Sequence, residues 1–415
     1  MGTLRKWLAP ALFAALTLIQ GCGGGGGGGG NGSSSSTVTP GTNAIAPAGS
    51  NVQPISVDAG LGGTVNLAFT SVTLCAPGSS ANCQTIDHVL IDTGSSGLRI
   101  MSSALGASLS LRQQTDASGN PVVECAHFAD GYSWGPVKLA DLKIAGEQAN
   151  SLPIQVIGDP NFSAAPSKCS STGPSKNSVQ ELRANGILGL AIFRQDCGNA
   201  CAFNGNPGIY YTCPASGCQQ AAMPLAMQLQ NPVSMFAVNN NGVIIELPSV
   251  PAAGAASVSG SLVFGIGTQA NNGIGTATVI GVDSNTANFT TIYNGTSYSS
   301  SFIDSGSNAF FFADAGMPVC TDPSAAGFYC PLATKNLFAT IQGRNGRSAS
   351  VDFSVANAVT LVTSNPGFAA FGNLAAPPLG GTSFDWGFPF FYGRKVYTAI
   401  EGASTPGGPG PYVAF

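Results

Sequence analysis

The chain contains few charged residues. Lys, Arg, Asp and Glu together make up 8% of its 415 residues, against about 25% in an average globular domain. The formal net charge is -4, and the Lys and Arg residues form no cluster. A protein that binds nucleic acid needs a basic surface, so this composition argues against such a partner.

The motifs of several common catalytic chemistries are also missing. The two histidines, His88 and His127, each lack a second histidine at metal-ligand spacing. Residues 94–97 read Gly-Ser-Ser-Gly, which is not the spacing of a Gly-x-Ser-x-Gly nucleophile turn. No phosphate-binding glycine loop occurs. We therefore expect no metal and no cofactor.

Glycine and hydroxyl residues are plentiful instead. The chain has 56 glycines, and its apolar runs are short and frequent, as is typical of a β-rich protein with many turns. Its length suffices for two lobes. Short helices are predicted at residues 179–183 and 224–230. Asn-Asn-Asn-Gly at residues 239–242 predicts a hairpin between the apolar runs 233–238 and 243–247.

Residues 1–21 have the features of a secretory signal peptide. A basic start precedes an apolar run at residues 7–19, which is shorter than the roughly 20 residues of a transmembrane helix. Ile-Gln-Gly then precedes Cys22, which resembles a bacterial lipobox with Cys22 as the lipidated residue. Residues 22–50 form a Gly/Ser-rich tether. We expect an exported lipoprotein, and Gly23 favours the outer membrane; an ordinary signal cleaved elsewhere is the alternative.

The cysteine count fits an oxidising compartment. Of the 11 cysteines, ten remain once Cys22 is set aside, an even number suited to disulfides. Close spacing predicts bridges Cys75–Cys83 and Cys320–Cys330. Four others allow three pairings, and zinc is the rival interpretation because their spacing is loosely that of ligands. These four are Cys197, Cys201, Cys213 and Cys218.

One short phrase occurs twice. Residues 91–96 read Ile-Asp-Thr-Gly-Ser-Ser, and residues 303–308 read Ile-Asp-Ser-Gly-Ser-Asn. Each follows apolar residues, so each predicts a strand that ends in a turn presenting one carboxylate, Asp92 or Asp304. A single Asp-x-Gly is usually only a turn. Two carboxylates brought together can share one proton and activate a water.

With these loops in place, the chain resembles the pepsin-like aspartic peptidases. Residues 92–98 resemble the first active-site loop of that family and residues 304–307 the second. Between them, residues 185–191 resemble the segment that supports the first loop. Residues 386–391 and 396–400 resemble the C-terminal strand region. The resemblance spans roughly residues 55 to 415, and with the lipobox it suggests a bacterial lipoprotein branch of the superfamily.

The resemblance implies a fold and a site. The fold would be all-β, with barrel or sandwich architecture, few short helices, and lobes at residues 51–250 and 251–415 flanking a cleft. The protein would be a monomeric endopeptidase acting on polypeptides, with Asp92 and Asp304 catalytic. Supporting roles are expected for the six loop neighbours: cross-loop hydrogen bonds for Thr93 and Ser305, backbone N–H groups at Gly94 and Gly306, and hydroxyl donors at Ser95 and Ser307.

Two departures from the family pattern are visible. Arg99 stands where the family usually has Trp. The family's flap carries a Tyr at its tip, whereas the corresponding stretch here offers Phe128, Gly131 and Tyr132 as candidates. A pepsin-like binding or assembly lipoprotein of the cell envelope, without catalysis, is therefore the alternative function.

Overall fold

The computed structural model describes residues 49–378, 380 and 382–415. The predicted signal peptide at residues 1–21, Cys22 and nearly all of the tether at residues 22–50 lie outside the described residues. Within the described part of the chain, no helix is both long and apolar enough to cross a membrane.

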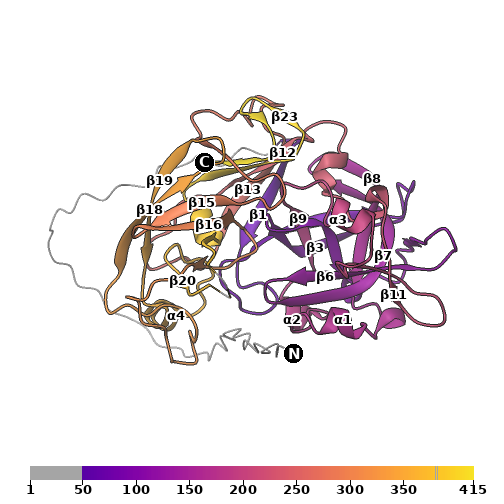
Figure 1. Cartoon of the computed structure of the whole chain (residues 1–415), viewed down its shortest axis with the longest axis horizontal. Coiled ribbons are helices and arrows are strands. Elements are labelled where there is room, and N and C mark those ends of the chain that lie inside the picture. The colour runs from indigo at the N-terminus through magenta and orange to yellow at the C-terminus, as the bar shows by residue number, and fades with distance from the viewer. Residues whose placement is uncertain (1–48, 379, 381) are drawn as a thin grey trace, which may run out of the picture.

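Strands make up 40% of the structure and helices 10%, which confirms the prediction of an all-β, two-lobed fold (Figure 1). The purple N-terminal half and the orange C-terminal half each form one body of strands. The longer strands are β1 (Val52–Val57), β2 (Ala68–Cys75), β3 (Cys83–Asp92), β4 (Ser96–Met101), β6 (Val122–Phe128), β7 (Gly131–Ile144), β8 (Glu147–Ile157), β9 (Gly186–Leu190), β12 (Gly242–Glu246), β13 (Val258–Phe264), β15 (Phe289–Tyr293), β16 (Thr296–Ile303), β18 (Lys335–Gln342), β19 (Ser348–Val355) and β22 (Lys395–Ala399).

Short strands complete the sheets. These are β5 (Arg112–Gln113), β10 (Tyr210–Thr212), β11 (Gln219–Gln220), β14 (Val279–Gly281), β17 (Phe310–Phe311), β20 (Ala375–Ala376), β21 (Asp385–Trp386), β23 (Ser404–Thr405), β24 (Gly408–Pro409) and β25 (Tyr412–Ala414).

Helices are few and short, as predicted. The α-helices of the described residues are α1 (Ser167–Ser170), α2 (Val179–Leu182), α3 (Asn199–Ala202) and α4 (Ala358–Ser364), and the 3-10 turns are η1 (Ser102–Ala104), η2 (Pro160–Phe162), η3 (Leu225–Met227), η4 (Pro232–Met235) and η5 (Phe388–Phe391). The helix predicted at residues 179–183 is α2, where the Ser178 side chain accepts a hydrogen bond from the Glu181 N–H.

The helix predicted at residues 224–230 is wrong. Only η3 forms there, because Gln228 is extended and its side-chain amide donates to the carbonyls of Gly198 and Met223. The hairpin predicted at residues 239–242 is also wrong. Asn231 and a proline at the first helical position start η4, which replaces the first expected strand.

The sheets bring distant parts of the chain together. The large sheet runs in the order β11-β10-β6-β7-β8-β4-β9-β3-β2-β1-β13-β12-β22-β25-β14, and a second sheet runs β19-β18-β15-β16-β21-β17-β20. β1, from the start of the described chain, pairs with β13 in the middle of the sequence. The large sheet therefore extends from the N-terminal half into strands of the C-terminal half.

The same strand crossing is built twice. β3 pairs in parallel with β9, so that Leu90 lies opposite Ile187. β16 pairs in parallel with β21, so that Phe302 lies opposite Asp385. Leu90 and Phe302 each lie two residues before the Asp of the repeated phrase. The sequence repeat is thus a repeat of local structure.

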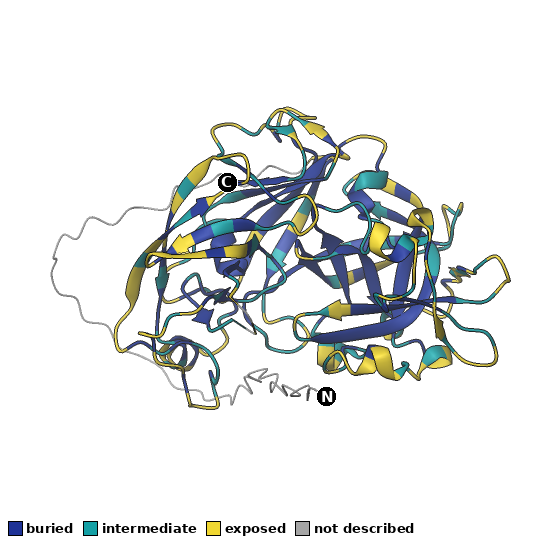
Figure 2. Cartoon of the chain, viewed as in Figure 1, coloured by how far each residue is buried: buried dark blue, intermediate teal, exposed yellow. Residues whose placement is uncertain are grey.

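Buried residues run along the strands of both halves, and exposed residues gather on peripheral turns and short helices (Figure 2). In the C-terminal half the core is aromatic. Trp386 stacks on Phe384 with ring centroids 4.5 Å apart, and Phe384 stacks on Phe312 at 4.8 Å. Trp386 belongs to β21 and lies opposite Ile303, so this cluster includes part of the strand pair that leads to Asp304.

All ten described cysteines form disulfides. The predicted bridges Cys75–Cys83 and Cys320–Cys330 are confirmed. The four cysteines of residues 197–218 pair as Cys197–Cys201 and Cys213–Cys218, so the thiolates that a zinc site would need are used in bridges. The fifth bridge, Cys125–Cys169, ties β6 to α1. The pattern fits folding outside the reducing cytosol.

We expect non-reducing peptide mapping of the full-length protein, purified in detergent, to recover Cys197–Cys201 and Cys213–Cys218 as separate linked peptides. A reduced and alkylated sample is the control. A bridge between the two pairs, or zinc bound in stoichiometric amount, would contradict this assignment.

Candidate active site

The two aspartates of the repeated phrase meet. Asp92 ends β3 and Asp304 follows β16 directly, and their carboxyl groups lie within hydrogen-bonding reach of each other. Each carboxyl also lies against the glycine of the opposite loop. A Cβ on Gly94 would lie 2.8 Å from Asp304 Cγ, and one on Gly306 would lie 2.7 Å from Asp92 Oδ1. Glycine is required at both positions because the carboxyls approach so closely.

Each carboxyl is held by its own loop in the same way. The Gly94 N–H donates to Asp92 Oδ1 at 2.8 Å, and the Ser95 hydroxyl donates to Oδ2. In the second loop, the Gly306 N–H donates to Asp304 Oδ1 at 2.7 Å. The Ser307 hydroxyl donates to Oδ2 at 2.9 Å. These bonds orient both carboxyls, and the bonds from Gly306 and Ser307 favour the charged form of Asp304.

The loops are also tied to each other by backbone contacts. The Thr93 N–H donates to the Ser305 hydroxyl oxygen at 3.0 Å, and the Ser305 N–H donates to the Thr93 hydroxyl oxygen at 2.9 Å. The Ser305 hydroxyl in turn donates to the Ile91 carbonyl at 2.8 Å. Ser305 is fully buried. These reciprocal bonds fix the distance between the two halves at the point where the carboxyls meet.

Burial and mutual repulsion determine the pKa of the carboxyl pair. Asp92 is 7% exposed. Burial, reinforced by the neighbouring Asp92 carboxyl, raises the pKa of Asp304 to about 8. Since the two groups lie within hydrogen-bonding reach of each other, the proton belongs to the pair. Such a pair holds one proton over a wide range of pH.

Tight strand crossings support both loops from below. Residues 185–191, which the sequence assigned to this role, contain β9. A Cβ on Gly189 would lie 2.7 Å from the Gly97 carbonyl oxygen, and one on Gly387 would lie 2.0 Å from the Ala309 carbonyl oxygen. Glycine lets each supporting strand run directly against the loop that carries the acid.

The hairpin of β6 and β7 carries the flap candidates. Phe128 ends β6 and pairs with Gly131 at the start of β7. A Cβ on Gly131 would lie 2.3 Å from the Pro174 carbonyl oxygen, so this end of the hairpin packs closely on that segment. Phe128 is partly exposed, and its ring lies 5.9 Å from the guanidinium carbon of Arg99.

Tyr132 has a different environment. It is 8% exposed and packs in an apolar cluster with Trp134 and the Cys125–Cys169 bridge. Its backbone is bonded to the segment that covers the hairpin, since its N–H donates to the Pro174 carbonyl at 2.9 Å. Of the two aromatic candidates, Phe128 lies at the hairpin end, and its ring has no hydroxyl.

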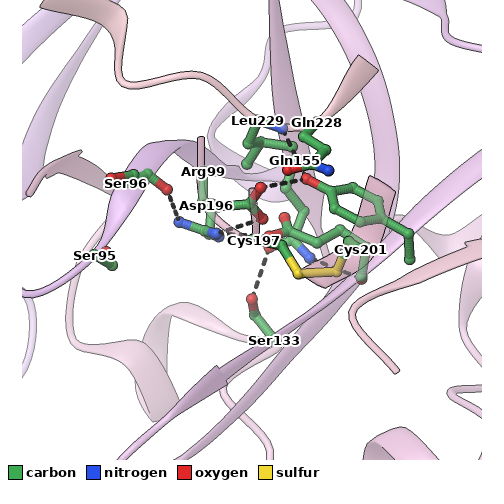
Figure 3. A network of polar contacts seen from close by, with 12 residues as sticks. Ser95, Ser96, Arg99, Ser133, Gln155, Asp196, Cys197, Cys201, Gln228 and Leu229 are labelled. Atoms are coloured by element: carbon green, nitrogen blue, oxygen red, sulfur yellow. Dashed lines mark hydrogen bonds and ion pairs between the residues drawn. A yellow bond between two sulfur atoms is a disulfide. The ribbon is translucent and has the colours of Figure 1, made fainter. Parts of the chain in front are cut away.

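Arg99, the second departure from the family pattern, is buried beside the first loop. Its Nη1 donates to the Ser96 carbonyl at 2.9 Å and its Nη2 to Glu124 Oε1 at 2.6 Å; Asp196 Oδ2 lies 3.6 Å away. The Tyr210 hydroxyl donates to Asp196 at 2.7 Å. Figure 3 shows Arg99 reaching between Ser96 and Asp196, with the Cys197–Cys201 bridge beside them.

This network joins three parts of the N-terminal half: the loop after Asp92, the strand β6 of the flap hairpin and the cysteine-rich segment. Burial, reinforced by the neighbouring Glu124 carboxyl, raises the pKa of Asp196 well above its usual range. A protonated Asp196 leaves Arg99 and Glu124 as a charge-balanced pair. Sequence reasoning missed Glu124, Asp196 and Tyr210, because no motif or regular spacing connects them.

Two of three comparisons with known proteins found a match. A family model described as "Protein of unknown function (DUF3443)" matches residues 47–415. No curated protein matches the chain. Among solved structures, the crystal structure of an aspartic proteinase from Irpex lacteus superposes with a TM-score of 0.51 and 14% sequence identity, covering 88% of this chain and 96% of that one. At this identity the likeness shows the fold.

Acid pH is expected to stabilise the fold through Asp304. In the folded protein the pair keeps its shared proton up to about pH 8, the raised pKa of Asp304, whereas the ordinary pKa of this carboxyl is 3.8. The folded state therefore binds more protons between these values, and its stability falls as pH rises across that window. Across this pH window the free energy of unfolding should fall less for the Asp304→Asn variant than for the wild type. We expect the two losses to differ by more than about 1.4 kcal/mol, the free energy of a tenfold change in proton affinity.

Thermal unfolding at a series of pH values measures this difference, with Asp322→Asn, an exposed acid, as the control. Parallel stability curves for wild type and Asp304→Asn would contradict the raised pKa.

Removing the Arg99 guanidinium is expected to destabilise the N-terminal half strongly. Arg99→Met leaves the fully buried Glu124 carboxylate without its partner, which costs about 3–5 kcal/mol. The same change at the exposed Arg112 should shift stability by no more than about 0.5 kcal/mol. Adding Glu124→Gln to Arg99→Met should recover part of the loss. Urea denaturation measures all three, and equal stability of the two Met variants would disprove the pairing.

Proposed function

We propose that this chain, which belongs to the family described as a protein of unknown function (DUF3443), is an aspartic endopeptidase. In this proposal a water activated by Asp92 and Asp304 attacks a peptide bond of a polypeptide held between lobes formed by residues 51–250 and 251–415. The observation that supports the proposal is that two loops of matching geometry hold the Asp92 and Asp304 carboxyls within reach of each other.

The mechanism follows from one shared proton. The ionised member of the pair accepts a proton from the water as the water oxygen attacks the scissile carbonyl carbon. The protonated member donates to the carbonyl oxygen, which becomes a hydroxyl in the tetrahedral intermediate. As the C–N bond of the intermediate breaks, the leaving nitrogen takes up a proton from the member that had accepted it from the water. The other member takes back a hydroxyl proton from the intermediate, so the pair again holds one proton. One carboxyl pair thus serves as base and acid in turn.

The neighbouring groups supply what this chemistry requires. The Ser95 and Ser307 hydroxyls and the Gly94 and Gly306 N–H groups donate to the carboxyls. Loss of one proton from the pair is therefore favoured at acid pH, although burial opposes it. The bonds between Thr93 and Ser305 limit the movement of the two acids relative to each other. A fixed separation keeps the attacking water in reach of both.

A non-catalytic function is the second candidate, and the flap supports it. The aromatic residue at the hairpin end is Phe128, which lacks a hydroxyl, and Tyr132 is buried away in the cluster around Trp134. A binding or assembly lipoprotein would use the same surface between the lobes to hold an extended peptide without cleaving it.

We also propose that the protein acts at the cell envelope. The five disulfides agree with an exported protein. The lipobox-like sequence before Cys22 supports a lipid anchor there, with the Gly/Ser-rich tether at residues 22–50 between membrane and fold. The proposed partners are a polypeptide substrate and the membrane.

The test of catalysis is cleavage of a denatured protein mixture by the full-length protein in detergent, followed by mass spectrometry at a series of acid to neutral pH values. We expect cleavage that peaks at acid pH. Asp92→Asn and Asp304→Asn should each lower it by at least roughly 100-fold, and the double variant should be little worse because the pair acts as a unit.

Asp116→Asn, which changes a partly exposed acid in a turn, is the matched control and should keep full activity. Wild-type protein that cleaves nothing at any of these pH values, yet binds an extended peptide as tightly as the Asn variants do, would establish the binding function instead.

A further inference from the structure

A third acid lies beside the pair. Asp385 lies on β21, and its side chain is 6% exposed. In the sheet it is opposite Phe302 and Phe311. The segment is fixed to the second loop, because the Asp304 N–H donates to the Trp386 carbonyl at 3.2 Å and the Phe388 N–H donates to the Ser307 carbonyl at 2.6 Å.

The position equivalent to Asp385 in the N-terminal half is occupied by an apolar residue. Ile187 lies opposite Leu90 in the register in which Asp385 lies opposite Phe302. Ile187 is 3% exposed, so the first half-site fills the space with a hydrocarbon side chain. The second half-site buries a carboxyl group there instead, which costs free energy unless the group is neutral or well bonded.

Asp385 is poorly bonded for a charged group. Its Oδ1 is buried and has no hydrogen-bond partner. The ionisable groups that act on it are Asp304, directly after β16, and Asp92, the last residue of β3, and both are acids. Burial, reinforced by the Asp304 carboxyl, holds the pKa of Asp385 well above its usual range.

The orientation of the Ser307 hydroxyl determines which group donates in a hydrogen bond between Ser307 and Asp385. This hydroxyl lies within hydrogen-bonding reach of Asp385 as well as of Asp304. A hydroxyl has one hydrogen and two acceptor lone pairs, and this hydrogen is directed to Asp304 Oδ2 at 2.9 Å. Only the lone pairs of Ser307 remain for Asp385. A carboxylate cannot donate to them, whereas a protonated carboxyl can.

We propose that Asp385 keeps its own proton while the pair works, and donates it in a hydrogen bond to Ser307, which directs the Ser307 hydroxyl at Asp304. Asp385 is then a positioning residue for the pair, acting through Ser307. Its effect on catalysis rests on the proposed peptidase function. The proton on Asp385 does not, because it follows from burial and hydrogen-bond direction alone.

Infrared spectroscopy of the full-length protein at neutral pH tests the proton directly. Protonated carboxyls have a carbonyl-stretch band separate from that of carboxylates. We expect Asp385→Asn to remove part of this band, and Asp304→Asn to remove a different part. Asp322→Asn, an exposed acid, should leave the band unchanged. A band that Asp385→Asn leaves intact would show that Asp385 is ionised and would overturn the proposal.

The pH profile of peptide cleavage tests the positioning role. Asp385→Asn keeps a neutral donor for Ser307 and should keep the wild-type profile. Asp385→Ile introduces the residue type found at the equivalent position of the first half-site, but it removes the group that donates to Ser307. The Ser307 hydroxyl is then less firmly directed at Asp304 and stabilises ionised Asp304 less. The alkaline limb should then move up by a few tenths of a pH unit.

Identical profiles of the Asn and Ile variants would overturn the role assigned to Ser307. Circular dichroism and thermal unfolding confirm that both variants fold. If no preparation cleaves peptides, the infrared result still decides whether Asp385 carries a proton, so failure of the inference is distinguished from failure of the peptidase function.

Discussion

Two carboxyl groups can share a small buried space only if they also share a proton, and the contact between Asp92 and Asp304 places this constraint on the structure around it. Like charges at hydrogen-bonding distance repel strongly in a poorly solvated site. Three features of the chain accommodate this repulsion. Glycines leave room for the opposite carboxyl, Thr93 and Ser305 bond reciprocally, and a parallel strand pair supports each loop. Each element supports the geometry of the pair from a different side.

The two half-sites share this frame but differ in what surrounds it. In the N-terminal half, Arg99 and Glu124 form a buried pair beneath the flap hairpin, and β10 of the cysteine-rich segment pairs with β6. The Cys125–Cys169 bridge fixes the same hairpin strand. In the C-terminal half, stacked aromatic rings support Trp386, and a third acid, Asp385, stands where the first half has Ile187. In the proposed peptidase, the N-terminal half would hold the flap hairpin in place and the C-terminal half would adjust the proton affinity of the pair.

Those parts of the site that depend on residues close together in the sequence could be predicted. The repeated phrase identified both acids and their hydroxyl and glycine neighbours, because the glycine and serine of each loop bond to the carboxyl two or three residues before them. Closely spaced cysteines likewise indicated their own bridges. The contact of Arg99 with Glu124, 25 residues apart, and its ion pair with Asp196 carried no such signal, since they depend on how strands pair. Asp385 was missed because a single acid in a two-residue strand has no pattern. The hairpin predicted at residues 239–242 was wrong because Pro232 and Asn231 start a 3-10 turn where apolar residues indicated a strand.

Neutron diffraction from crystals of the protein grown in heavy water at mildly acid pH tests the central claim most directly, because it locates the exchangeable hydrogens themselves. The account predicts one deuteron shared between the carboxyls of Asp92 and Asp304, and hydroxyl deuterons on Ser95 and Ser307 directed at those carboxyls. Carboxyls that are both without a deuteron, or that each carry one of their own, would contradict the account, since neither state has both the base and the acid that the pair must provide.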